Sequence, residues 1–212
     1  MSQTDNELIT KGLNPPQRMA VETLHGPLLI LAGAGSGKTR VLTHRMANVI
    51  AQGLAAPDEM LAVTFTNKAA HEMESRIFKI LTDIGISLRE PLWVSTFHSF
   101  CNRVLRTHIA LLEYKTHFSI YDDSDQLSQI KKVMNVLNIN DKTFPAKNFR
   151  SRINSAKMLA LSANDIENSS KMYIDQKSLE VYKLYEQEMK KANALDFGDL
   201  LFKVYELFRR PR

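Results

Sequence analysis

The stretch Ala32-Gly33-Ala34-Gly35-Ser36-Gly37-Lys38-Thr39 decides the fold class of this chain. It contains three of the eight glycines in 212 residues, follows the apolar run Leu28–Leu31, and precedes a segment with helical spacing of apolar residues. In a phosphate-binding P-loop, a glycine-rich turn between a strand and a helix directs backbone N–H groups and the positive end of the helix toward an anion. The strict pattern opens with Gly, whereas this chain has Ala32, as other nucleotide-binding families do. The stretch therefore predicts a site for a phosphorylated nucleotide.

Two side chains at the end of the loop have the chemistry that a nucleotide with bound Mg²⁺ requires. We expect the Lys38 ammonium to reach the β- and γ-phosphates and the Thr39 hydroxyl to bind Mg²⁺. The alternative is a glycine-rich turn that ends in Lys-Thr by chance. The setting between an apolar run and a helical pattern favours the P-loop.

The overall composition is that of an ordinary soluble globular protein, with 44% hydrophobic and 24% charged residues. A net charge of +5 and a pI near 9.3 permit binding to a polyanion, although a mildly basic surface without such a partner fits equally. The single cysteine, Cys101, excludes an internal disulfide and is consistent with a reducing compartment. No apolar run approaches a membrane span, and Met1–Lys11 is too polar for a signal peptide. We expect a cytoplasmic protein with no membrane partner.

The pattern of apolar residues changes along the chain. Short apolar runs at Leu28–Leu31, Met60–Phe65 and Leu92–Phe97 are each followed by a helical pattern, which predicts strands of a parallel sheet. Beyond about residue 110 the chain reads as helices, apart from Phe118–Tyr121. We interpret the apolar stripes of these helices as core and not as binding surface, and residues 135–143 and 162–171 as polar loops between them. The sequence therefore predicts an α/β nucleotide-binding domain to which a helical domain is added.

Gln17 has two interpretations. In the sequence Asn14-Pro15-Pro16-Gln17, Asn14 can cap a helix, and Gln17 at the third helical position can complete a capping box. A glutamine side chain also offers one donor and one acceptor, which match N7 and N6 of adenine. Its place about twenty residues before the P-loop keeps the second interpretation open.

Polar and aromatic side chains follow two of the predicted strands, at the point where a helix begins. Phe65, Thr66 and Asn67 follow the second strand, and Thr96 and His98 flank the end of the third. Each hydroxyl or amide can simply cap a helix. However, the carboxyl ends of parallel strands are where α/β proteins bind ligands, and an aromatic ring beside hydroxyls can stack on a base. Two such junctions favour a nucleic-acid track.

With these residues identified, the chain resembles the N-terminal part of superfamily 1 DNA helicases of the UvrD/Rep/PcrA type. The matching motifs run in family order over nearly the whole chain. They are Leu13–Gln17 (the Q motif), the P-loop extended to Arg40, Ala62–Ala70 (motif Ia), Ser95–Ser99 (motif Ib), Phe118–Asp123 and Leu195–Leu201.

The resemblance implies a RecA-like P-loop NTPase domain with a parallel sheet, incomplete and interrupted by a helical insertion. On this basis, residues 1–110 form the first part of the RecA-like domain 1A, residues 111–194 form the insertion 1B, and residues 195–212 return toward 1A. The implied function is ATP-dependent translocation 3′ to 5′ on single-stranded DNA with duplex unwinding, in DNA repair or replication. Single strand–duplex junctions and the second RecA-like domain of the same protein are the implied partners.

The resemblance also implies site residues, with ATP and Mg²⁺ as cofactors. Lys38 and Thr39 are the expected catalytic residues, and Thr39 the expected magnesium ligand. The expected nucleotide contacts are Gln17, Ala32, Gly33, Ala34, Gly35, Ser36, Gly37, Lys38, Thr39 and Arg40. The expected DNA contacts are Phe65, Thr66, Asn67, Thr96 and His98.

The family's apolar strand ending in Asp-Glu, which holds Mg²⁺ and activates water, is not found before Arg212. The chain therefore looks like a helicase fragment that is inactive alone. One alternative is a complete small NTPase in which Asp122 and Asp123 take the metal-binding role, although both are also well placed as helix caps. Another is a module that binds single-stranded DNA or a partner protein without turnover.

Overall fold

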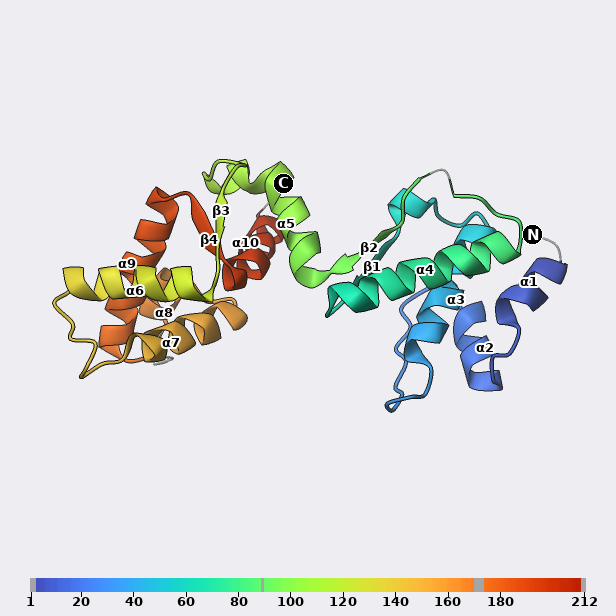
Figure 1. Ribbon diagram of the computed structural model, residues 1–212, viewed down its shortest axis with the longest axis horizontal. Helices are drawn as coiled ribbons and strands as arrows, with labels where there is room; N and C mark the ends of the chain where they lie inside the picture. The colour runs from blue at the N-terminus through green and yellow to red at the C-terminus, as the bar shows by residue number, and fades with distance from the viewer. Residues whose placement is uncertain (1–2, 89, 170–173, 211–212) are drawn as a thin grey trace. The chain divides into compact units, whose positions relative to one another are not determined.

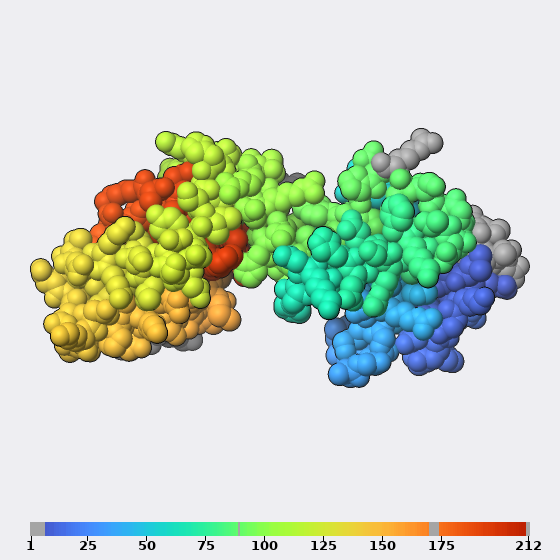
Figure 2. All heavy atoms as spheres, in the orientation of Figure 1, coloured from blue at the N-terminus to red at the C-terminus, as the bar shows by residue number. Residues whose placement is uncertain are grey.

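The computed structural model describes residues 3–88, 90–169 and 174–210. Figure 1 shows its helices and strands, and Figure 2 shows the heavy atoms of the same view. The chain divides into two compact units, Met1–Phe97 and His98–Arg212, here called the first and second units. Within the described ranges, no helix combines the length and the apolar character needed to cross a membrane.

The first unit contains a two-stranded parallel sheet and the helices that cover it. The strands pair in register from Leu61 opposite Trp93 to Thr64 opposite Thr96. They confirm two of the three predicted strands, each slightly shorter than expected. The elements are α1 (Gln3–Thr10), α2 (Pro15–Glu22), α3 (Lys38–Ala51), a 3₁₀ turn (Pro57–Glu59), β1 (Leu61–Thr64), α4 (Asn67–Asp83) and β2 (Trp93–Thr96).

The structure contradicts the predicted strand at Leu28–Leu31. This segment has no regular secondary structure, and Leu29 and Leu31 are 81% and 87% exposed. An extended segment becomes a strand only when a neighbour completes its hydrogen-bond ladder, and no described residue pairs with it. The prediction of a strand at this apolar run is therefore wrong for the described residues.

The core of the first unit lies mainly between α3, α4 and the sheet. Met73, Ile77 and Leu81 recur at helical spacing on α4 and are buried with Ala47 and Leu92. A second, smaller cluster joins α1 and α2 to the first turn of α3, with Ile9, Val21 and Val41 at its centre. This packing fixes the start of α3, where the P-loop ends.

The second unit is mainly helical. A short parallel pair of strands lies within it, with Ser119 opposite Ala194 and Tyr121 opposite Asp196. The second of these strands was not predicted, and α8 lies in a stretch that we expected to be a polar loop. The elements are α5 (Phe97–His108), a 3₁₀ turn (Ile109–Leu112), β3 (Ser119–Tyr121), α6 (Asp123–Val136), α7 (Ala146–Met158), α8 (Ala163–Glu167), α9 (Gln176–Lys191), β4 (Ala194–Asp196) and α10 (Phe197–Arg209).

The predicted apolar stripes form the core of the second unit. Ile130 and Met134 on α6, Ile153 on α7, and Tyr182 and Tyr185 on α9 are buried together. A smaller cluster between α5, β4 and α10 includes Cys101, Leu105 and Leu195. These stripes are core and not binding surface, as their spacing predicted. The assignment of residues 1–110, 111–194 and 195–212 to three domain segments stays a prediction.

Candidate nucleotide and nucleic-acid site

The loop before α3 has the backbone shape that its glycines allow. Gly35 and Gly37 take positive φ angles of 74° and 87°, a region that other residues rarely enter. The Ser36 hydroxyl closes the turn by donating to the Gly33 carbonyl oxygen at 2.7 Å. Gly37 is the N-cap of α3 and provides no side-chain cap, so the start of the helix has no capping side chain of its own, which is the arrangement that suits an anion as the cap.

Lys38 is the first residue of α3, and its side chain folds over the loop. Its Nζ atom donates to the carbonyl oxygens of Ala32 at 3.0 Å and Gly33 at 2.6 Å. The ammonium group is therefore held beside the backbone of the loop, within the region where phosphates bind in P-loops. The arrangement places one positive charge and a helix N-terminus at the same point.

Gln17 performs the capping role that the sequence offered as the simpler interpretation. Its backbone N–H donates to Asn14 Oδ1 at 3.0 Å, and its Oε1 accepts from the Asn14 N–H at 3.1 Å. The remaining amide group also reaches the loop, because Nε2 donates to the Ser36 carbonyl oxygen at 2.9 Å. A Cβ atom at Gly37 would lie only 2.7 Å from this nitrogen. Gln17 therefore ties α2 to the P-loop.

A cavity of about 240 Å³ lies between α2 and the loop. Its apolar wall includes Ala20, Ile30 and Val41, and its polar rim includes Gln17 and Lys38. An apolar wall with polar groups at one edge suits a heterocyclic base better than a sugar or a free phosphate. The cavity opens beside the group that is expected to bind the phosphates.

Thr39 and Arg40 follow Lys38 in the first turn of α3, and both are exposed. The Arg40 guanidinium lies 3.4 Å from the Lys11 carbonyl oxygen. The described residues contain no group of three or more His, Cys, Asp or Glu side chains arranged to hold a metal. A Mg²⁺ ion at this loop would take the Thr39 hydroxyl, phosphate oxygens and water as its ligands, which is a donor set that Mg²⁺ accepts.

The first predicted junction presents an aromatic surface at the end of β1. Phe65 is 92% exposed, and its ring packs against Phe97 with the ring centroids 5.7 Å apart. Thr66 is the N-cap of α4 and accepts from the Ala69 N–H at 3.2 Å, which confirms the capping interpretation for this residue. Asn67 is exposed, whereas Thr96 is buried. Phe65, Thr66 and Asn67 are therefore the predicted DNA contacts that the first unit presents to solvent.

The second junction carries an aromatic residue, Phe197, that was not predicted as part of the site. His98 is exposed at the start of α5, and its ring meets Phe197 edge to face with the centroids 6.1 Å apart. Phe197 is 48% exposed and begins α10 directly after β4. The signal for it was an aromatic residue at a strand–helix junction, but a three-residue strand gives no periodic pattern to detect.

Asp122 and Asp123, the alternative metal-binding pair, are engaged in helix capping and ion pairing. Asp122 is the N-cap of α6, and its Oδ1 accepts from the N–H groups of Ser124 at 2.7 Å and Asp125 at 2.9 Å. The bond from the Asp125 N–H and those from Ser124 lower the pKa of Asp122. Asp123 lies 3.6 Å from Arg150. This geometry favours the capping interpretation over a catalytic one.

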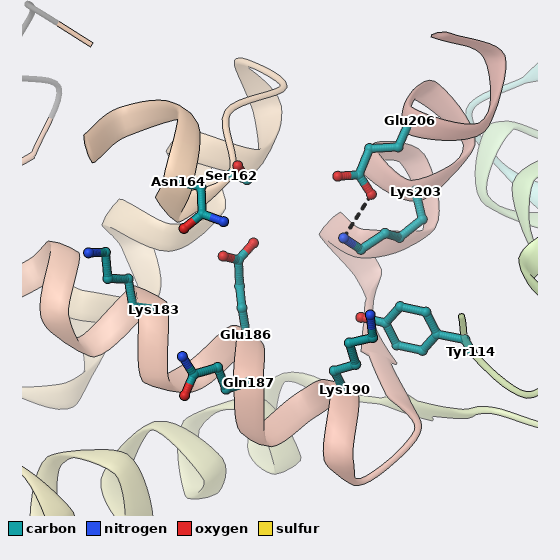
Figure 3. Close-up of a pocket in the computed structure, with 9 residues that line it drawn as sticks. All are labelled: Tyr114, Ser162, Asn164, Lys183, Glu186, Gln187, Lys190, Lys203 and Glu206. Atoms are coloured by element: carbon teal, nitrogen blue, oxygen red, sulfur yellow. Dashed lines mark ion pairs between the residues drawn. The ribbon is translucent and has the colours of Figure 1, made fainter. Parts of the chain in front are cut away.

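A second cavity, of about 400 Å³, lies between α9 and α10 in the second unit (Figure 3). Three lysines line it, but each already pairs with a carboxylate. Lys183 pairs with Glu167, Lys190 with Glu113 at 2.7 Å, and Lys203 with Glu206 at 2.8 Å. Because these charges are balanced, the cavity lacks the free positive charge of a phosphate site.

Glu186 points into this cavity, and burial raises the pKa of its carboxyl group. Because the pKa of Glu186 is higher in the folded than in the unfolded chain, this group stabilises the fold at pH values below its unfolded-state pKa. That stabilisation is lost as the pH rises through the folded-state pKa. Glu186→Gln keeps an oxygen to accept from the Ala163 N–H, 3.1 Å away, and removes the titration. We expect the free energy of unfolding at neutral pH to rise by about 1 kcal/mol and its decline from acid to neutral pH to flatten.

Urea denaturation at a series of pH values measures this effect. Glu180→Gln, on the exposed side of the same helix, is the matched control and should change the free energy of unfolding by less than about 0.5 kcal/mol. A profile as steep in Glu186→Gln as in the unchanged chain would contradict the prediction.

Comparison with known proteins identifies the family. Residues 13–212 match the UvrD/REP helicase N-terminal domain. The chain is 43% identical over 210 residues to the ATP-dependent DNA helicase PcrA of Bacillus subtilis, which covers 99% of this chain and 28% of that protein. It is 41% and 40% identical to the PcrA helicases of Staphylococcus aureus and Staphylococcus epidermidis, covering 93% and 95% of this chain and 27% of each relative. The chain belongs to the UvrD/REP helicase family and corresponds to its N-terminal domain.

Proposed function

We propose that this chain provides the ATP-binding site and part of the single-stranded-DNA track of a DNA helicase that moves 3′ to 5′. The observation that carries the proposal is the loop at residues 32–37, with Lys38 folded over it and Gln17 tying α2 to it. The chain spans 28% of the length of the Bacillus subtilis relative, so unwinding is proposed for the whole protein. The second RecA-like domain of that protein is the proposed partner in hydrolysis.

The nucleotide side of the proposal assigns one task to each group. Lys38 neutralises charge on the β- and γ-phosphates, and the loop N–H groups bind the same oxygens. Thr39 holds Mg²⁺ with the phosphates, and Arg40 lies on the same helical turn to contact the nucleotide. The base occupies the cavity beside Gln17. Hydrolysis of Mg·ATP bound by these residues would supply the free energy for movement of the whole protein.

The DNA side of the proposal rests on exposed aromatic rings. Phe65 with Phe97, and His98 with Phe197, are two ring pairs on which bases can stack without regard to sequence. The second unit also carries the positive charge, with 19 Lys and Arg against 14 Asp and Glu, whereas the first has 9 of each. This charge suits the phosphates of a single strand and of a single strand–duplex junction.

Lys38→Ala tests the nucleotide site. We expect the affinity for Mg·ATP, measured by isothermal titration calorimetry, to fall about tenfold, because a charge-assisted contact to the phosphates is lost. Lys68→Ala is the control, because it removes an exposed lysine on α4 in the same unit, and it should bind Mg·ATP as tightly as the unsubstituted chain does. Equal affinity in the Lys38 variant would remove the proposed phosphate role.

Phe65→Ala tests the DNA track. We expect roughly tenfold weaker binding of a fluorescent oligothymidine in an anisotropy titration at low salt, because one stacking contact is lost. Phe78→Ala removes another exposed aromatic ring of the first unit and should have no effect. Undiminished binding in Phe65→Ala would exclude this ring from the track.

The second candidate function is a module that binds single-stranded DNA without hydrolysing ATP. The exposed Phe65–Phe97 pair also fits this function. DNA binding by the chain without any Mg·ATP binding would support it.

A further inference from the structure

A buried carboxylate in the second unit collects hydrogen bonds from three helices. Asp196 is the last residue of β4, and its Oδ2 accepts from Gln126 Nε2 on α6 at 2.8 Å, Lys157 Nζ on α7 at 2.7 Å and Tyr185 Oη on α9 at 2.8 Å. Its Oδ1 accepts from the Asp199 N–H at 2.9 Å and so caps α10. The residues Gln126, Lys157, Tyr185, Asp196 and Asp199 are called the Asp196 cluster below.

The Asp196 cluster contains a fully buried ion set. Lys157 Nζ also lies 2.8 Å from Asp199 Oδ1, and the side chains of Lys157 and Asp196 are 1% and 2% exposed. Replacing such a set with apolar residues of similar volume is often neutral or stabilising, because charges lose their hydration when they are buried. Unlike apolar packing, directional hydrogen bonds between charged groups hold the groups in one geometry. Here these bonds fix the geometry of the start of α10.

The start of α10 carries Phe197, the partner of His98. Asp196 and Asp199 form a reciprocal capping box on either side of Phe197, which holds its backbone at both ends. Gly198 packs directly on the cluster, because a Cβ atom there would lie 3.2 Å from Lys157 Cδ and 3.3 Å from Asp196 Oδ1. The backbone around Phe197 is thus attached to α6, α7 and α9 through one carboxylate.

We infer that the Asp196 cluster is a positioning device for the single-strand contact of the second unit. It sets the place and angle of the Phe197 ring and, through the edge-to-face contact, of the His98 ring. Asp196 and Lys157 are positioning residues, since they are buried and reach a DNA base only through Phe197. The inference rests on the proposed function, which assigns the His98–Phe197 pair to the DNA track.

The geometry is tested first without DNA. We expect Asp196→Asn and Gly198→Ala to shift the NMR resonance of the His98 Cε1 proton, because a displaced Phe197 ring changes the ring current at that proton. Gly198→Ala presses on the cluster while leaving all its polar groups in place, so it serves if Asp196→Asn fails to fold. Asp122→Asn alters the corresponding cap of α6 and is the control. An unchanged His98 resonance in a folded Asp196→Asn or Gly198→Ala variant would overturn the inference.

A double-mutant cycle then tests the link to DNA in the 212-residue chain. We expect Phe197→Ala to weaken oligothymidine binding roughly tenfold and Gly198→Ala to weaken it roughly threefold. In the Phe197→Ala background, Gly198→Ala should cause no further loss, because a positioning residue acts only through the ring that it positions. A merely structural role would give the same loss in both backgrounds and would overturn the inference.

The two proposals fail in different ways. If Phe197→Ala binds DNA as the unchanged chain does, the proposed role of this ring pair in the DNA track is wrong, and the positioning role toward DNA is wrong with it. If Phe197→Ala binds weakly while both cluster variants bind normally and keep the His98 resonance, only the positioning role is wrong.

Discussion

Replacing Lys157 with methionine is expected to lower the free energy of unfolding by about 3–5 kcal/mol. Methionine fills nearly the same volume as lysine, so the loss of stability measures the removal of the charge and not a change in packing. Without the ammonium group, Asp196 and Asp199 remain buried, 2.7 and 2.8 Å from where Nζ lay, with no positive partner at that place. A buried carboxylate without its partner carries the full penalty of lost hydration.

Urea denaturation followed by circular dichroism measures this loss. Lys131→Met removes an exposed lysine, 3.3 Å from Asp141, and is the matched control, with an expected loss below about 1 kcal/mol. Burial raises and Lys157 lowers the pKa of Asp196, and the net value lies below the usual range. In the unsubstituted chain the lowered pKa of Asp196 therefore stabilises the fold at pH values above the unfolded-state pKa. This stabilisation is lost as the pH falls through the folded-state pKa. Equal stability of the two methionine variants would contradict the prediction.

Ile77→Ala is expected to destabilise the first unit by about 2–5 kcal/mol. Ile77 has no exposed surface and packs on α4 with Met73 and Leu81 against Ala47 and Leu92. Truncation removes buried methyl groups and leaves a cavity that the helix and the short sheet can fill only partly. Because this cluster also fixes α3, the variant should weaken the whole unit and not only α4.

The neighbouring residue provides the control. Phe78 is larger than Ile77 but 53% exposed, so Phe78→Ala should change the free energy of unfolding by less than about 1 kcal/mol. Both variants are compared by chemical denaturation, with a spectroscopic probe that detects unfolding of the first unit. A larger loss for Phe78→Ala than for Ile77→Ala would mean that the burial on α4 is assigned to the wrong face.

Long periodic segments were the part of the fold that the sequence could predict. The apolar stripes on α6, α7 and α9, and the two strands β1 and β2, follow from spacing alone. The strand expected at Leu28–Leu31 was wrong, since pairing depends on a neighbour and not on the segment itself. The strand at Ala194–Asp196 was missed because three residues show no period.

For a similar reason, some residues of the candidate site could be predicted from the sequence and others could not. Gln17 and the loop to Lys38 stand out because glycine, proline and capping residues have local meanings. The burial of Lys157 could not be foreseen, because a lysine in an amphipathic helix is normally at the surface. Only contacts from distant parts of the chain, such as the one with Asp196, make its burial favourable. The proposed role of Phe197 could not be foreseen either, because it depends on where His98 lies.

The double use of the Gln17 carboxamide has a consequence for base recognition. Its oxygen accepts from the Asn14 N–H, and one of its two donor hydrogens is given to Ser36. The amide still has one free hydrogen and one free lone pair, which match N7 and N6 of adenine. A purine that binds both would leave the bonds to α2 and to the loop in place, so base, helix and loop would share one side chain. Adenine in the base cavity is therefore expected to reduce the fraying of α2, and a nucleotide without that base edge would leave the fraying unchanged.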